Sequence, residues 1–147
     1  MTRAISQKRN LKFEGIPKDE VRDDHPDTLE SLNDFGVLRR EQGQYDEAEE
    51  LLTEARDKRQ VILGPDHPHT LESAHELAVL YAAQSRYEDA ERLILEAFHG
   101  RETKLGLKHP HTLDSLKHLV TLYESRGRPE EAEKWRSKLA QTKAVKE

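Results

Sequence analysis

Histidine is the residue type in this sequence that most readily suggests chemistry. The chain has eight His and no Cys. Two His-x-His pairs, His67/His69 and His109/His111, have a spacing that could chelate a metal ion. However, each pair recurs within a longer repeated stretch, so we interpret these histidines as helix-capping residues. We expect no metal site and no cofactor, and a histidine-dependent metal-binding protein is the weakest alternative.

Signatures of catalysis are missing from the sequence. It contains no nucleophile elbow, no glycine-rich phosphate loop and no His-Glu-x-x-His motif. The carboxylate pairs Glu49-Glu50 and Glu130-Glu131 fall on segments whose pattern predicts solvated helix surface. Trp135 could form a ligand platform, but it aligns with apolar positions of the other repeats and is therefore expected in the core. We predict that the protein is not an enzyme.

The histidines lie in a stretch that occurs three times at a spacing of 42 residues. His67-Pro68-His69-Thr70-Leu71-Glu72-Ser73 is preceded by a copy at residues 25–31 and followed by another at residues 109–115. Self-similarity at a fixed period of this size indicates stacked repeats. The repeats are predicted to span residues 25–66, 67–108 and 109–147, after a non-repeat leader, residues 1–24, that we expect to be poorly ordered.

Each period contains two helical patterns. In the second repeat, Leu71, Ala74, Leu77, Ala78 and Tyr81 form one apolar stripe at helical spacing, and a similar stripe follows after a short break. A proline sits in the first turn of each leading helix, where its missing N–H is tolerated. The sequence therefore predicts an all-α chain, with helices near residues 26–42, 45–62, 68–84, 87–104, 110–126 and 129–142.

These patterns resemble a known repeat family. The spacings Leu77-Ala78-x-x-Tyr81 and Ala90-x-x-x-Ile94-x-x-Ala97 look like a tetratricopeptide repeat. The 42-residue period and the linker Leu63-Gly64-Pro65-Asp66-His67-Pro68 resemble the kinesin light chain type. The resemblance implies a right-handed superhelical solenoid of three antiparallel helix-turn-helix repeats. The chain departs from the family's paired asparagines, with Asn33-Asp34, His75-Glu76 and Lys117-His118 instead, and Arg136 replaces an apolar residue, which suggests a polar end to the stack.

Stacks that resemble this one bind extended peptides along a concave groove lined by the first helix of each repeat. We therefore predict a protein-interaction module or scaffold, whose partner is a protein or peptide held in that groove. The candidate groove residues lie on the first helices outside the apolar stripe: Glu30, Asn33, Val37, Arg40, Glu72, His75, Val79, Ala82, Asp114, Lys117, Thr121 and Glu124. Asn33 is the best single candidate, because a side-chain amide both donates to and accepts from a peptide backbone.

Charge and composition narrow the remaining classes of function. The net charge is −5 and no basic face is evident, which argues against nucleic-acid or anionic-membrane binding. An apolar run long enough for a membrane span or a signal peptide is missing from the sequence, so a cytoplasmic protein is expected. The first repeat is acidic and the last is basic. This polarity favours an alternative in which the chain self-associates or stacks with a larger repeat array.

Overall fold

The structure, a computed structural model, describes residues 25–144 as a row of helices joined by short turns. The expectations for the leader, residues 1–24, lie outside the described residues. The helices are α3 (Pro26–Glu41), α4 (Tyr45–Leu63), α5 (Pro68–Ala83), α6 (Tyr87–Leu105), α7 (Pro110–Ser125) and α8 (Pro129–Ala144). Every predicted helix is confirmed, with ends within two residues of the expected ones, and the described residues form no strand.

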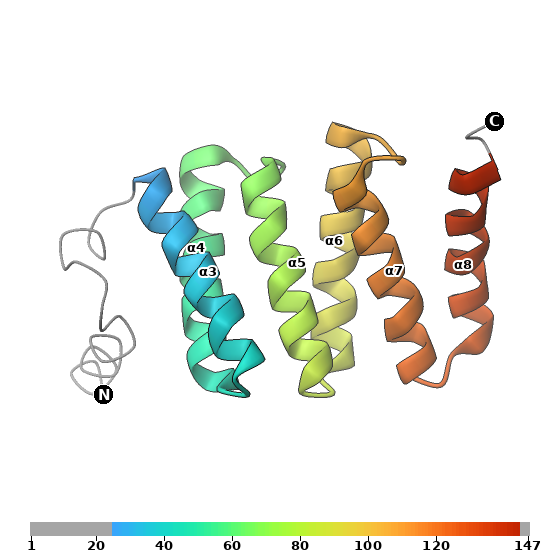
Figure 1. Cartoon of the computed structure of the whole chain (residues 1–147), viewed down its shortest axis with the longest axis horizontal. Coiled ribbons are helices and arrows are strands. Elements are labelled where there is room, and N and C mark those ends of the chain that lie inside the picture. Colours follow the sequence, from blue (N-terminus) through green and yellow to red (C-terminus); the bar gives the residue numbers. More distant parts are fainter. Residues whose placement is uncertain (1–24, 145–147) are drawn as a thin grey trace.

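The helices form an all-α solenoid of three antiparallel pairs, α3–α4, α5–α6 and α7–α8 (Figure 1). Each helix packs against the next one along the chain. The first helices of neighbouring pairs also touch one another, α3 against α5 and α5 against α7. These three helices therefore share one face of the stack, which we call the first-helix face.

Histidine begins the first helix of each pair. The Nδ1 atom of His67 accepts a hydrogen bond from the backbone N–H of His69 at 3.1 Å, and Pro68 occupies the first helical position. His25 and His109 make the same bond at 3.1 Å. A side-chain acceptor at this position satisfies a backbone donor that has no partner inside the helix. The prediction that the repeated histidines cap helices is thus confirmed for these three.

The turn inside each pair requires a left-handed backbone. Gly43 and Gly127 adopt φ values of 77° and 72° in the first and third turns. The equivalent position in the second turn holds Ser85, at φ 61°. An L-residue in this region is strained relative to glycine, so the second turn forms at some energetic cost.

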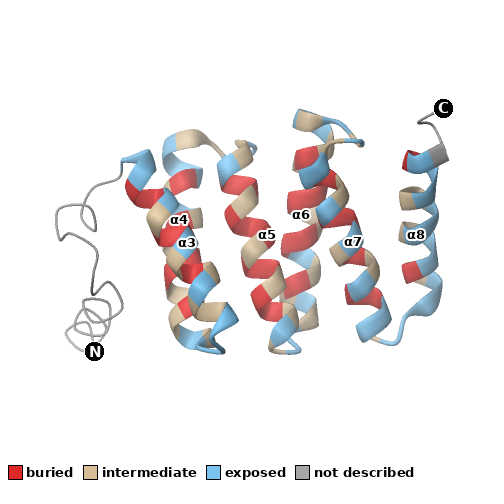
Figure 2. Cartoon of the chain, viewed as in Figure 1, coloured by how far each residue is buried: buried red, intermediate tan, exposed pale blue. Residues whose placement is uncertain are grey.

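The core lies between the helices and follows the predicted stripes (Figure 2). One apolar cluster runs from α4 to α8, and a smaller one, formed by Leu29, Leu32, Leu51 and Ala55, closes the first pair. Small residues permit close helix packing: a Cβ atom on Gly36 would lie 2.5 Å from Leu52 Cγ. Trp135 is half-buried and packs on Phe98 with the ring centroids 5.4 Å apart. Arg136 is exposed, as expected for a polar end.

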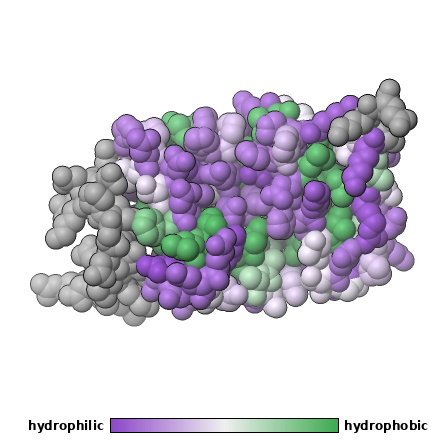
Figure 3. Space-filling model, in the orientation of Figure 1, coloured by the Kyte–Doolittle hydropathy of each residue, from purple (hydrophilic) through white to green (hydrophobic). Residues whose placement is uncertain are grey.

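On the face viewed in Figure 3, the surface of the stack is mostly hydrophilic, with separate hydrophobic areas. Within residues 25–144, none of the helices is both long and apolar enough to cross a membrane.

Candidate functional site

The candidate groove residues lie on α3, α5 and α7, and the structure brings them to the first-helix face with two exceptions. Five of them are exposed: Glu30, Asp114, Lys117, Thr121 and Glu124. Five others are half-buried: Val37, Arg40, Glu72, Val79 and Ala82. The first-helix face thus combines exposed polar groups with partly covered apolar and charged ones.

The two exceptions are Asn33 and His75, which are 3% and 2% exposed. The sequence predicts that both line the groove, with Asn33 as the leading candidate for peptide contact. Both side chains instead bond to groups of the following repeat, so their polar atoms are already used. The helical spacing places them beside the other predicted groove residues, but the neighbouring first helix covers them.

The junction between the first and second repeats is organised around a buried arginine. Arg59 of α4 donates from Nη1 to the His69 carbonyl oxygen (2.9 Å), to Ser73 Oγ (3.0 Å) and to Glu72 Oε1 (3.1 Å). Ser73 Oγ donates to Asn33 Oδ1 at 2.8 Å, and Asn33 Nδ2 donates to Glu72 at 3.4 Å. The amide therefore acts as an acceptor on one side and a donor on the other.

The junction between the second and third repeats has the same arrangement, with histidine in place of asparagine. Arg101 of α6 donates from Nη1 to Ser115 Oγ (2.8 Å) and to the His111 carbonyl oxygen (3.1 Å). His75 Nδ1 lies 3.0 Å from both Ser115 Oγ and Arg101 Nη1. On the other side of the ring, His75 Nε2 lies 3.3 Å from Asp114 Oδ2.

A second histidine joins this junction. His118 lies one helical turn after Asp114 on α7, and its Nε2 is 3.8 Å from Asp114 Oδ1. Its ring meets that of His75 edge to face, with centroids 4.8 Å apart. His75, Asp114 and His118 are the one group of three metal-ligating side chains that gathers within the described part of the chain. The His67/His69 and His109/His111 pairs, by contrast, gain no third ligand there.

The environment of this group shifts its ionisation equilibria. The hydrogen bond from His75 lowers the pKa of Asp114 to about 2, and the positive charge of Arg101 contributes in the same direction. Burial lowers the pKa of His118, with a further contribution from neighbouring His75. Burial also lowers the pKa of Arg101. At neutral pH, Asp114 is therefore a carboxylate and His118 is a neutral imidazole.

Several of the other predicted groove charges are already paired within the chain. Arg40 forms an ion pair with the Glu76 carboxylate, and Arg40 Nη1 also donates to the Glu76 carbonyl oxygen at 3.4 Å. Glu124 forms an ion pair with Arg136 of α8. Thr121 Oγ1 donates to the carbonyl oxygen of Lys117 at 3.1 Å, inside its own helix. The first-helix face consequently presents less unpaired charge than its sequence suggests.

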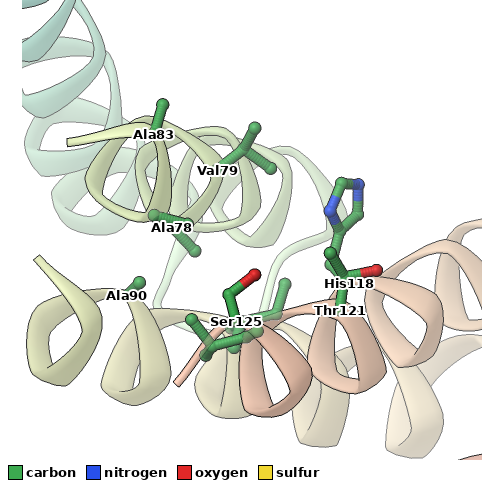
Figure 4. Close-up of a pocket in the computed structure, with 10 residues that line it drawn as sticks. Ala78, Val79, Ala83, Ala90, His118, Thr121 and Ser125 are labelled. Atoms are coloured by element: carbon green, nitrogen blue, oxygen red, sulfur yellow. The ribbon is translucent and has the colours of Figure 1, made fainter. Parts of the chain in front are cut away.

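A pocket of about 290 Å³ opens beside these residues, between α5 and α7 with α6 as its floor (Figure 4). Small and apolar side chains form most of its wall. The lining residues are Ala78, Val79, Ala82, Ala83, Ala90, Ile94, His118, Thr121, Leu122 and Ser125. The predicted residues Val79, Ala82 and Thr121 thus come together at one site, beside the group formed by His75, Asp114 and His118.

Reasoning from sequence missed some of these residues. His118 enters the sequence pattern only as a departure from the family's asparagines, although Asp114 and His118 are four residues apart and so share a helix face. Arg59 and Arg101 stand one 42-residue period apart, which is a usable signal for a repeated structural role. The pocket has no sequence signal of its own, because its walls come from three helices.

Comparison with sequence families matches the chain to a repeat family. The profile described as tetratricopeptide repeat matches residues 27–103, a little more than half of the chain. Among curated proteins, none matches the chain significantly.

Solved structures with the same architecture include the putative kinesin light chain of Podosopora anserina, described as having nearly identical TPR-like repeats. It is 29% identical, with a TM-score of 0.73, over 82% of this chain and 57% of that one. A point-mutant form of the same protein is 28% identical, with a TM-score of 0.71, over 84% and 58% of the two chains. BtubC (BKLC) from P. vanneervenii shares the fold, with a TM-score of 0.77 and 17% identity over 97% of this chain and 52% of that one. The chain spans little more than half the length of these structures.

Proposed function

Since the chain belongs to the tetratricopeptide repeat family and its repeats are of the kinesin light chain-like type, we propose that its first-helix face binds an extended segment of another protein. Tetratricopeptide folds are in general scaffolds for protein–protein interaction, and this family is typically non-enzymatic. The finer proposal is that α3, α5 and α7 form a concave groove, and that the chain acts there without catalysis.

The observation that carries the proposal is the pocket between α5 and α7. Ligand sites are typically concave and largely apolar, with a few polar groups that orient the ligand. Ala78, Ala82 and Ile94 supply an apolar lining, while Ser125 and Thr121 supply hydroxyl groups. A volume of about 290 Å³ suits one apolar side chain of a bound segment and leaves the rest of that segment on the open face.

The charges of the first-helix face indicate what kind of side chains the rest of the ligand should carry. Because Arg40 and Glu124 are engaged by ion pairs within the chain, a highly charged ligand finds few free partners. Lys117 and Glu30 are exposed and opposite in sign. We therefore expect a mainly polar or mixed-charge segment with one apolar anchor. Three repeats offer a short groove, so the affinity should be near micromolar, or about −8 kcal/mol.

A pocket-filling substitution tests the proposal. Peptides that bind the wild-type chain would be selected from a displayed random library, and their affinities measured by fluorescence anisotropy. Ala82→Leu places added bulk in the pocket and should weaken binding at least about tenfold, which corresponds to about 1.4 kcal/mol. The same substitution at exposed Ala140 of α8, away from the first-helix face, is the matched control and should leave affinity unchanged.

Equal binding by the Ala82→Leu and Ala140→Leu chains would show that the pocket is not the site. The alternative of self-association or stacking on further repeats would then take its place. Leu38 of α3 is the residue to test there, because it is 43% exposed whereas its equivalents Leu80 and Leu122 are buried.

A further inference from the structure

His75, Asp114 and His118 bring three metal-ligating atoms together at the junction of the second and third repeats. These atoms all lie within 4.8 Å of one another. The separations of 3.3 Å between His75 and Asp114, and 3.8 Å between Asp114 and His118, are near those around a bound ion. Bonds of about 2.0–2.1 Å at tetrahedral angles place ligand atoms roughly 3.3 Å apart. Small side-chain rotations would therefore bring the three groups onto one ion.

We propose that these three residues bind one divalent transition-metal ion, of the zinc, nickel or copper type. Two imidazoles and one carboxylate are the ligands these ions favour, whereas calcium and magnesium prefer all-oxygen sites. Three protein ligands leave at least one coordination position for water or for a donor atom from a bound molecule. This proposal does not depend on the binding function proposed above, although the site shares His118 with the pocket.

The ionisation states of the group suit a cation. Metal ligands bind in their deprotonated forms, which here are the Asp114 carboxylate and the neutral imidazoles of His75 and His118. The three side chains already face one another in the arrangement these forms need. Glu76 of α5 and its ion-pair partner Arg40 both lie near enough to His118 to interact with it electrostatically, with opposite effects.

In the metal-free chain His75 donates from Nε2 to Asp114. To hold an ion it must present a bare Nε2, so metal binding would shift its proton to Nδ1. Ser115 Oγ, 3.0 Å away, is positioned to accept a hydrogen bond from that proton. Arg101 Nη1 can then direct its two protons to the His111 carbonyl oxygen and Ser115 Oγ, both of which it already contacts. Ligating histidines usually donate their second N–H in this way, which fixes the ring for metal binding.

The group is open to solvent on one side. The side chains of Asp114 and His118 are 58% and 40% exposed, while that of His75 is only 3% exposed. An ion can therefore arrive from the first-helix face, next to the apolar pocket that His118 also lines. The buried imidazole would form the base of the site, and the two exposed groups would close over the ion.

The first junction provides a natural comparison within the same chain. The positions 42 residues earlier hold Asn33, Glu72 and Glu76, and Glu76 is engaged by Arg40. An amide and two carboxylates are poor ligands for a zinc-type ion. The metal-ligating set thus occurs only at the second junction among the described residues, although the two backbones repeat each other.

Isothermal titration of the full untagged chain with zinc chloride at pH 7.5 tests the site. The wild-type chain should bind one zinc ion, and zinc should raise its melting temperature by mass action. His75→Asn copies the residue that already fits the first junction, so it should fold with unchanged circular dichroism. It should lose the one-to-one isotherm, or weaken it by more than the 10–100-fold typical of disturbing a ligand's hydrogen-bond partner. His118→Gln, at a half-exposed position, should do the same.

The capping histidines provide the matched control. In the fourfold variant His67→Asn, His69→Gln, His109→Asn and His111→Gln, asparagine keeps the helix caps and both His-x-His pairs are gone. This variant should bind zinc as the wild type does. Binding that survives in His75→Asn and His118→Gln but disappears in the fourfold variant would overturn the proposal, as would the absence of one-to-one binding by the wild-type chain.

Discussion

The two junctions between repeats use different side chains for the same hydrogen-bonding task. In both, a buried arginine on the preceding second helix bonds a carbonyl oxygen and a serine hydroxyl of the next first helix. The serine hydroxyl then contacts an acceptor atom in a polar side chain of the preceding first helix. The second polar atom of that same side chain faces a carboxylate. The corresponding pairs are Arg59 and Arg101, Ser73 and Ser115, Glu72 and Asp114, and Asn33 and His75.

The difference lies in what each polar side chain can do besides bonding. Asn33 offers an acceptor oxygen and a donor nitrogen but does not titrate. His75 presents the same pattern through its two ring nitrogens, and an imidazole is in addition a side chain that commonly ligates metal ions. The comparison shows that the two junctions share a pattern of hydrogen-bond donors and acceptors rather than a residue type. New chemistry can therefore enter one junction without a change in the fold.

Removing either buried arginine should destabilise the fold more than the other substitutions at the two junctions. Arg59→Ala and Arg101→Ala should each lower the free energy of unfolding by about 2–4 kcal/mol, because hydrogen bonds to charged groups contribute roughly 1.5–3 kcal/mol and the packed stem is also lost. Urea unfolding followed by circular dichroism measures this. Exposed Arg92 of α6 is the control, and its replacement by alanine should cost less than about 0.5 kcal/mol. Destabilisation by only one of the two substitutions would show that the two arginines do not have equivalent roles.

Exchanging the two polar residues should give an asymmetric, intermediate effect. Asn33→His adds a ring to a buried position and should cost about 1–3 kcal/mol through overpacking. His75→Asn keeps an acceptor for Ser115 and a donor for Asp114, so it should cost about 1 kcal/mol or less. Both variants would be compared by urea unfolding with a chelator present. Equal costs would mean that the two junctions are not matched to their own side chains.

The smallest effect should be a change in how stability depends on pH. The pKa of His118 is lowered in the folded chain, so the unfolded chain binds more protons below its ordinary pKa of about 6.5. Its contribution to stability is complete above that pH and is lost as the pH falls through the folded pKa. His118→Gln should therefore show a smaller loss of stability between pH 7.5 and 5.5 than the wild type. Some loss should remain, because burial also lowers the pKa of His67.

An unchanged pH dependence in His118→Gln would indicate that the second junction does not respond to protonation of this residue. Asp114 should contribute nothing in the same window. Its lowered pKa, about 2, means that its contribution is lost only as the pH falls below about 3.9.

Local sequence patterns predict the helices and where they start, and the resemblance to tetratricopeptide repeats implies how they pair. Local physics is sufficient for this: His67, Pro68 and the backbone of His69 form a complete cap within three residues. The apolar stripe then fixes which side of each helix is buried, and the 42-residue period requires the pairs to stack. The all-α repeat fold followed without knowledge of any contact between repeats.

The packing between repeats sets which residues beside that stripe remain exposed. The helical spacing puts Asn33 and His75 at the edge of the stripe, where a small rotation of the helix separates buried from exposed. The approach of the next first helix covers them, and it also creates the pocket near Val79 and Thr121 and brings His75 to Asp114 and His118. Distances between helices depend on side-chain packing across the whole junction, and the spacing of residues along one helix does not contain them.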